Sequence, residues 1–200
     1  LAVAATGVVH LLNNLFKGGL LGKRADWPTV VKFGLPAVPP AIAGAWLLAL
    51  LGDTPRFFEW QAFGETFGPT GAGLAIGLLM ILFASLELQR WFQDLKAPPR
   101  LMPLGGMVTG FFGGLTGQEG ALWSIFLLRL GLPAERFIAT GAMIAILVDL
   151  SRVATYAASF TTAGLNPAGR EGLLVLVGTL SAFAGTYLAT RHLDKITIGA

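Results

Sequence analysis

Four stretches of the chain contain no Asp, Glu, Lys or Arg, and each is long enough to cross a lipid bilayer as a helix. They are residues 33–52, 66–86, 101–118 and 172–190, which are 20, 21, 18 and 19 residues long. A spanning helix needs about 20 mostly apolar residues. Charged residues make up 12% of this chain, whereas soluble domains carry about 25%. The sequence therefore predicts a polytopic membrane protein, and it argues against a soluble globule or a disordered chain.

Several other classes of protein lack support in the sequence. The absence of Cys excludes a disulfide scaffold and a Cys-based metal or redox site. His residues occur only at positions 10 and 192, which argues against a metal centre. No HExxH, GxSxG or GxxxxGK[ST] pattern occurs, and no basic patch with interleaved aromatics points to nucleic acid. The expected partners are the lipid bilayer and a small solute. We do not expect the protein to be an enzyme or to bind a cofactor.

Six hydrophobic segments follow one another along the chain. They lie at residues 1–17, 34–52, 69–91, 101–131, 136–159 and 171–190. The clearest breaks, where we expect loops, lie at residues 53–68, 94–100 and 161–170. This order predicts an all-α fold, a transmembrane helical bundle with short connectors.

Short sequence matches recur in the same order in the two halves of the chain. Ala5-Thr6-Gly7 returns as Ala139-Thr140-Gly141, and Asn14-Leu15-Phe16-Lys17 returns as Asp149-Leu150-Ser151-Arg152. Ala43-Gly44-Ala45-Trp46-Leu47 returns as Ala184-Gly185-Thr186-Tyr187-Leu188. The matches predict two repeats, residues 1–97 and 98–200. On this interpretation the first repeat lacks a Gly-rich helix at its start and the second lacks its last helix, as in a fragment of a longer chain.

Glycine dominates the segment 101–131. Seven glycines fall within the 16 positions from Gly105 to Gly120. Because Gly costs about 1 kcal/mol relative to Ala in a helix interior, we expect the helix to break beside Gln118 and Glu119. Backbone N–H groups freed at such a break attract an anion. The alternative is that the glycines only let one continuous helix pack closely against its neighbours.

The distribution of Lys and Arg bears on how the segment 101–131 meets the membrane. If it crosses, the loops carry seven basic residues on one side and five on the other, whereas the division is ten to two if it dips in and returns. The positive-inside rule favours the re-entrant arrangement. That arrangement also makes the two halves inverted repeats, as in many secondary transporters. A single tilted crossing stays open, because the segment has 31 residues.

Polar and ionisable side chains interrupt two of the hydrophobic segments, each on one helical face. They are His10, Asn13, Asn14 and Lys17 in the first segment, and Asp149, Arg152 and Tyr156 in the fifth. A charge at the centre of a membrane helix costs at least about 2.5–3.5 kcal/mol, so these groups should face the bundle interior or a wet cavity. One interpretation is an anion site. The alternative is that Asp149 and Arg152 only pair with each other, while Lys17 snorkels to the interface.

The Gly-rich run and its surroundings also carry a family resemblance. The run Gly110-Phe111-Phe112-Gly113-Gly114-Leu115-Thr116-Gly117-Gln118-Glu119-Gly120 is followed by Leu127, Gly131-Leu132 and Ala139-Thr140-Gly141. These motifs resemble the sulfite exporter (TauE/SafE-like) family over nearly the whole chain. The resemblance also includes Ala5-Thr6, Asn14 to Lys17, Phe33-Gly34-Leu35-Pro36 and Gly44. The resemblance implies two repeated helical halves and transport of small sulfur-containing anions, such as sulfite or sulfonates, across the cytoplasmic membrane.

We therefore expect a secondary transporter of a small anion, with its site where segments 1–17, 101–131 and 136–159 converge. The expected solute-binding residues are Asn13, Asn14, Lys17, Gly113, Gly114, Gln118, Thr140 and Arg152. The residues expected to hold counter-charge or a coupling proton are His10, Glu119 and Asp149. We expect no catalytic residue and no metal ligand. An anion channel of the same fold and a non-transporting membrane scaffold are the alternatives.

Overall fold

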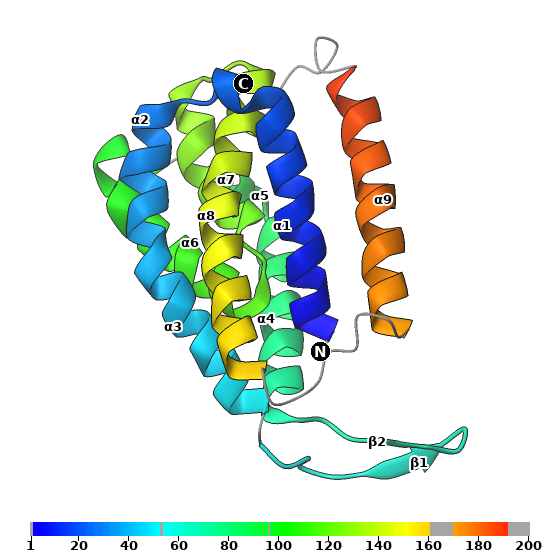
Figure 1. The fold of residues 1–200 in the computed structure, drawn as a ribbon. Coiled ribbons are helices and arrows are strands. Elements are labelled where there is room, and N and C mark those ends of the chain that lie inside the picture. The colour runs from blue at the N-terminus through cyan, green and yellow to red at the C-terminus, as the bar shows by residue number, and fades with distance from the viewer. Residues whose placement is uncertain (1, 53, 96, 161–169, 192–200) are drawn as a thin grey trace.

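A computed structural model describes residues 2–52, 54–95, 97–160 and 170–191, and most of this part of the chain is helical (Figure 1). Its first half contains α1 (Ala2–Leu21), η1 (Gly22–Arg24), α2 (Trp27–Thr29), η2 (Val30–Gly34), α3 (Leu35–Gly52), β1 (Trp60–Ala62), β2 (Glu65–Phe67), α4 (Gly71–Glu87) and α5 (Arg90–Gln93). Its second half contains η3 (Pro99–Leu101), α6 (Met102–Thr116), α7 (Gly120–Leu127), η4 (Leu128–Leu130), α8 (Ala134–Phe160) and α9 (Arg170–Thr190). Residues 161–169 of the loop expected at 161–170 lie outside the described residues.

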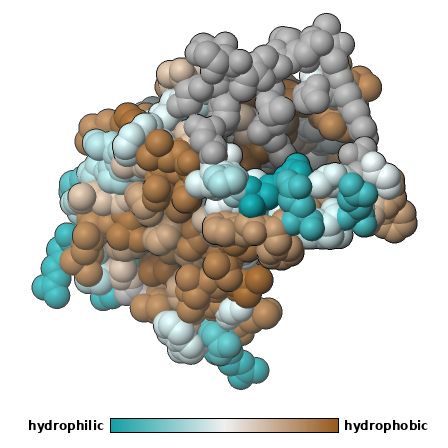
Figure 2. All heavy atoms as spheres, turned by 90° about the horizontal axis from the view of Figure 1, so that it is seen from below, coloured by the Kyte–Doolittle hydropathy of each residue, from teal (hydrophilic) through white to brown (hydrophobic). Residues whose placement is uncertain are grey.

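Three of the described helical stretches are long and apolar enough to cross a membrane. They are Trp27–Gly52, Ala134–Ala158 and Gly172–Thr190. Seen from the lower end of the bundle, apolar side chains cover much of the described surface, and hydrophilic ones gather in separate patches (Figure 2). A surface of this kind suits lipid rather than water. The all-α membrane fold predicted from the charge-free segments is therefore confirmed.

Helices α1 and α8 form the centre of the bundle and run antiparallel. Gly7 of α1 lies against Val153, while Gly18 lies against Ile146, so positions rise in α1 as they fall in α8. Helix α3 packs on α8, and α9 packs on α1, which places α3 and α9 on opposite flanks of the central pair (Figure 1). The two helices that carry the polar faces thus lie against each other.

Glycines bring α6 into direct backbone contact with η2 and with α3, which continues it. A Cβ atom on Gly106, Gly110 or Gly114 would overlap the carbonyl oxygen of Phe33, Ala37 or Ala41, respectively. The spacing of four residues on both helices shows that they run parallel with one turn facing one turn. Small residues at this spacing allow the close helix approach that membrane interiors favour.

The segment 101–131 is broken at residues 117–119 and folds back on itself. Helix α6 ends at Thr116, and α7 returns from Gly120. Phe126 of α7 covers Gly105 near the start of α6, and Met102 and Leu127 share one apolar cluster with Phe33. Both ends of the hairpin therefore lie at the same end of the bundle, which is the geometry of the re-entrant alternative. The glycines of this segment therefore both pack α6 closely against its neighbour and precede a break in the helix.

The structure differs from the sequence-based expectation at two places. Helix α1 continues past Lys17 and Gly18-Gly19 to Leu21, because the Gly18 face packs on Ile146 and Met143 of α8. The stretch 53–68, expected to be a loop, contains the short antiparallel strands β1 and β2. Neither difference moves the polar residues of α1 and α8.

Substitution of Gly110 by Ala should destabilise the bundle. The added Cβ would meet the backbone of Ala37, which cannot move aside as a side chain can. Overpacking of side chains costs about 1–3 kcal/mol, and a clash with a fixed backbone belongs at the upper end of that range, above the roughly 1 kcal/mol that Ala returns in helix propensity. We expect a lower midpoint of thermal unfolding in detergent. Gly77→Ala is the control, because no atom lies within 4 Å of its added Cβ, and an equal loss in both variants would contradict this packing.

Candidate functional site

The break between α6 and α7 depends on Gly117. This residue has φ of 79°, in the left-handed region, and its N–H donates to the Gly113 carbonyl oxygen at 2.8 Å. A Cβ at Gly117 would overlap Nη1 of Arg152, so a side chain is excluded by the backbone angle and by the neighbouring guanidinium. The glycine therefore both ends the helix and makes room for a cation.

Three ionisable side chains are buried beside this break. The exposed fractions of Glu119, Asp149 and Arg152 are 4%, 0% and 1%. Arg152 Nη2 lies 2.8 Å from Asp149 Oδ1, one turn away on α8. Glu119 Oε2 would lie 2.9 Å from a Cβ on Gly113, so the carboxyl group packs back on α6. The pairing of Asp149 with Arg152, which the sequence left open, is thus present, and a second carboxyl group lies beside it.

Two further polar side chains hold this cluster in place. Asn14 Nδ2 donates to Asp149 Oδ2 at 2.8 Å, which ties α1 to α8. The Tyr156 hydroxyl donates to the Gly114 carbonyl oxygen at 2.9 Å, which ties α8 to the last turn of α6. Asn14 and Asp149 are the matched positions of the sequence repeat, and their side chains meet between the two central helices.

The cluster retains polar atoms without hydrogen-bond partners. Among the described residues, none is placed to bond Glu119 Oε2 or Arg152 Nε, and Arg152 Nη2 meets Asp149 Oδ1 without hydrogen-bond geometry. Buried polar groups are nearly always satisfied, and an unsatisfied one costs about 1–3 kcal/mol, more when charged. The described side chains thus leave part of the bonding capacity of Arg152 available to a solute or to water.

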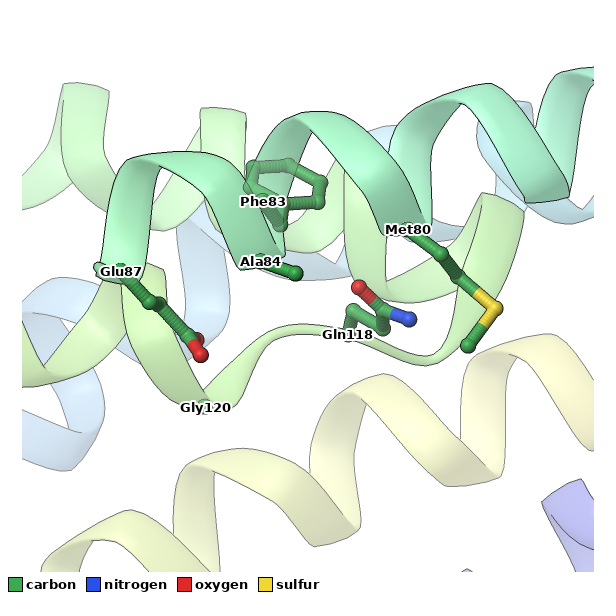
Figure 3. A pocket seen from close by; sticks show the side chains of 6 residues that line it. All are labelled: Met80, Phe83, Ala84, Glu87, Gln118 and Gly120. Atoms are coloured by element: carbon green, nitrogen blue, oxygen red, sulfur yellow. The ribbon is translucent and has the colours of Figure 1, made fainter. Parts of the chain in front are cut away.

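A cavity of about 350 Å³ opens beside the guanidinium of Arg152. Its lining comes from α1, α4, the helix break and α8, and comprises Val3, Thr6, His10, Met80, Thr116, Gly117, Gln118 and Arg152. A second cavity of about 330 Å³ shares Met80 and Gln118 with it. In Figure 3 the Gln118 amide lies between Ala84 and Met80, and the Glu87 carboxylate points toward Gly120 at the break. Gln118 and Met80 therefore stand between two adjoining cavities.

The structure brings most of the predicted site residues together. Those at the helix break, in the ionic cluster or on the cavity wall are His10, Asn14, Gly113, Gly114, Gln118, Glu119, Asp149 and Arg152. Lys17 lies on the edge of this group, with Nζ 3.5 Å from Asn14 Oδ1. The Asn13 amide faces α9 instead, 2.8 Å from the Thr186 hydroxyl.

Thr140 lies apart from the other predicted residues. Its hydroxyl accepts the backbone N–H of Asp26 at 2.8 Å and donates to the Arg136 carbonyl oxygen at 2.7 Å. Asp26 in turn pairs with Arg136 at 2.8 Å. In this structure Thr140 therefore joins the connector after α1 to the start of α8.

Several residues that line or support the site were not among the expected solute-binding residues. Thr116 and Gly117 belong to the same Gly-rich run, and their place directly before Gln118 is a signal that was available. Tyr156 shares the face of Asp149 and Arg152, which also signals a role. Met80 gives no such signal, because it stands in an apolar helix and reaches the cavity only through the packing of α4 against the break. No group of three or more metal-binding side chains occurs in the part of the chain that the structure describes.

Helices long and apolar enough to cross a membrane, packed with a broken α6–α7 hairpin and with buried charges beside its break, define a helical membrane protein. The family model described as Sulfite exporter TauE/SafE matches residues 1–198. The chain therefore belongs to the TauE/SafE sulfite exporter family, as its Gly-rich run implied. Searches of curated proteins and of solved structures gave no match.

Substitution of Gly117 by Ala should damage the site beyond the cost of backbone strain. A non-Gly residue in the left-handed region costs about 1–2 kcal/mol, and here the new methyl group also displaces the Arg152 guanidinium. Gly131→Ala is a matched control, because Gly131 has φ of 60° and no atom within 4 Å of an added Cβ. Thermal unfolding of the two variants in detergent should show the larger loss for Gly117→Ala. Equal losses would mean that Arg152 does not depend on this glycine.

Proposed function

We propose that the protein is a secondary transporter that binds a small anion, and is neither an enzyme nor a scaffold. The observation that carries this proposal is Arg152, a guanidinium with 1% exposure on the wall of a cavity of about 350 Å³ at a helix break. A buried cation of this kind in a membrane protein is a functional site by default, because burial without a role is costly. The bilayer and the small anion are its proposed partners.

The cavity offers hydrogen-bond donors suited to an oxyanion. The guanidinium of Arg152 on α8 and the amide of Gln118 at the helix break line it, and His10 of α1 adds an imidazole. Guanidinium groups bind the oxygens of carboxylate, phosphate and similar anions with paired hydrogen bonds. A sulfur oxyanion such as sulfite, or a small sulfonate, presents oxygens in this way, and the family assignment favours that class.

The charge balance of the cluster supports coupling of the anion to a proton. Asp149 and Glu119 carry two negative charges when ionised, and Arg152 carries one positive charge, so the buried cluster alone has one excess negative charge. An arriving anion would add a second. Because charges at membrane depth need compensation, we propose that Glu119 takes up a proton when the anion binds. Asp149 then serves as the counter-charge of Arg152, positioned by Asn14.

We propose that residues 1–97 and 98–200 are inverted repeats that move relative to each other. The antiparallel pairing of α1 with α8 supports this. So does the exchange of partners, in which the second helix of each half packs on the first polar helix of the other, α3 on α8 and α9 on α1. Rocking of such halves around a fixed site is a common route to alternating access. The proposed location is the bacterial cytoplasmic membrane.

Replacement of Arg152 by Gln should abolish anion transport. The variant removes the cation of the cavity and leaves Asp149 without its ion pair, so uptake of ³⁵S-labelled sulfite into proteoliposomes should fall by about 100-fold or more, if the lost charged hydrogen bonds are worth about 3 kcal/mol. Arg100→Gln is the control, because Arg100 is exposed before α6. Uptake at the wild-type rate by Arg152→Gln would refute the site, and the absence of uptake by the wild-type protein would refute the substrate class.

Replacement of Glu119 by Gln should uncouple the anion from the proton. Gln resembles the protonated carboxyl group, so the variant should still bind and exchange the anion across the membrane. Net uptake driven by an imposed pH gradient should fall toward the rate without a gradient, measured in the same proteoliposomes with an internal pH dye. A pH-driven uptake equal to that of the wild-type protein would assign proton coupling elsewhere.

A further inference from the structure

The connector between α3 and α4 is a pinned hairpin rather than a loose loop. At its base, the Thr54 hydroxyl donates to the Leu51 carbonyl oxygen at 2.7 Å and accepts the Gly71 N–H at 2.9 Å. Beyond it, β1 and β2 pair in antiparallel register, with Trp60 opposite Phe67. In Figure 1 this hairpin extends sideways from the lower end of the bundle, across the direction of the helices.

One face of the hairpin gathers three aromatic side chains. Neighbouring side chains on a strand point to opposite faces, so Phe58 and Trp60 share a face with Phe67. Their rings stack in sequence, with centroids 5.7 Å apart between Phe58 and Trp60 and 5.9 Å apart between Trp60 and Phe67. The opposite face carries Glu59, Gln61 and Thr66. All three aromatic rings of the first face are exposed.

Phe63 at the tip of the hairpin has an unusual conformation. Its φ is 55°, and it is the one non-glycine residue with positive φ among the described residues. With Gly64 at φ 78° it forms a two-residue turn in which both central residues have positive φ, a turn that favours Asn-Gly. Its side chain is fully exposed, at 102%. The described chain thus offers neither a backbone reason nor a packing reason for Phe at this position.

We propose that this hairpin lies in the membrane interface, with Phe58, Trp60 and Phe67 toward the lipid and Phe63 inserted at the headgroup level. The hairpin begins beside Gly52, where the spanning stretch Trp27–Gly52 ends. The adjoining helices also expose apolar side chains, among them Leu50 of α3 and Leu74 of α4. Amphipathic aromatic rings favour this layer of the bilayer, and a lipid contact compensates the exposed, strained Phe63. The hairpin then fixes the depth at which the spanning stretch Trp27–Gly52, which includes α3, crosses the membrane.

Fluorescence of Trp60 in the full chain tests this proposal. The variant Trp27→Phe, Trp46→Phe, Trp91→Phe, Trp123→Phe keeps Trp60 as the single tryptophan, with circular dichroism and the unfolding midpoint as checks of its fold. In phosphatidylcholine vesicles brominated near the glycerol end of the acyl chains, we expect its emission to fall by about half, with little quenching by aqueous iodide. Strong iodide quenching without quenching by the brominated lipid would overturn the proposal.

Phe63→Asn, added to this reporter chain, separates the lipid contact from the fold. Asn suits the turn better than Phe, so a purely structural role predicts an unchanged or higher unfolding midpoint and unchanged lipid quenching. The membrane contact predicts that lipid quenching of Trp60 falls at least twofold while the midpoint in detergent holds. Gln61→Ser, on the opposite face, should change neither. Trp60 quenching that varies with the protein-to-lipid ratio and not with bromination would assign the aromatic face to a second copy and overturn the proposal.

Discussion

The contact between the Arg152 guanidinium and the glycine break is the constraint on which the rest of the structure depends. Arg152 lies in the membrane-depth part of α8, against Gly117 and beside Gly7 of α1. Any side chain at Gly117 would push the cation away, and without the cation the buried Asp149 would lose its ion pair. One buried charge therefore links the central helices to the re-entrant hairpin.

The contact between α3 and α6 determines where the α6–α7 hairpin turns back. Because Gly106, Gly110 and Gly114 let the two backbones touch, α6 is held at a defined height on α3. The height in turn places Gly117 beside Arg152 and Glu119 beside Gly113. Close packing of small residues thus positions the polar site. This explains why one Gly-rich run both packs α6 against α3 and breaks the helix after Thr116.

Several features were predictable from the chain because they depend on local properties. The charge-free segments indicated the membrane helices, since the cost of charge in lipid limits where Lys, Arg, Asp and Glu stand. The glycines before Gln118 indicated the break. The matched positions of Asn14 and Asp149 indicated related roles, and the two side chains meet at 2.8 Å. The role of Thr140 was not predictable in the same way, because its hydrogen bonds are made with Asp26, more than 100 positions away.

By itself the sequence determined the class of protein, the polar helical faces and the position of the helix break, because hydrophobicity and glycine content act within one segment. The tertiary structure alone decided which of these residues share a cavity. Met80 lines that cavity, the Asn13 amide faces α9, and Phe63 is exposed at the tip of the β1–β2 hairpin. These outcomes depend on how helices far apart in the chain pack side by side. The spacing of residues within one segment does not determine that packing.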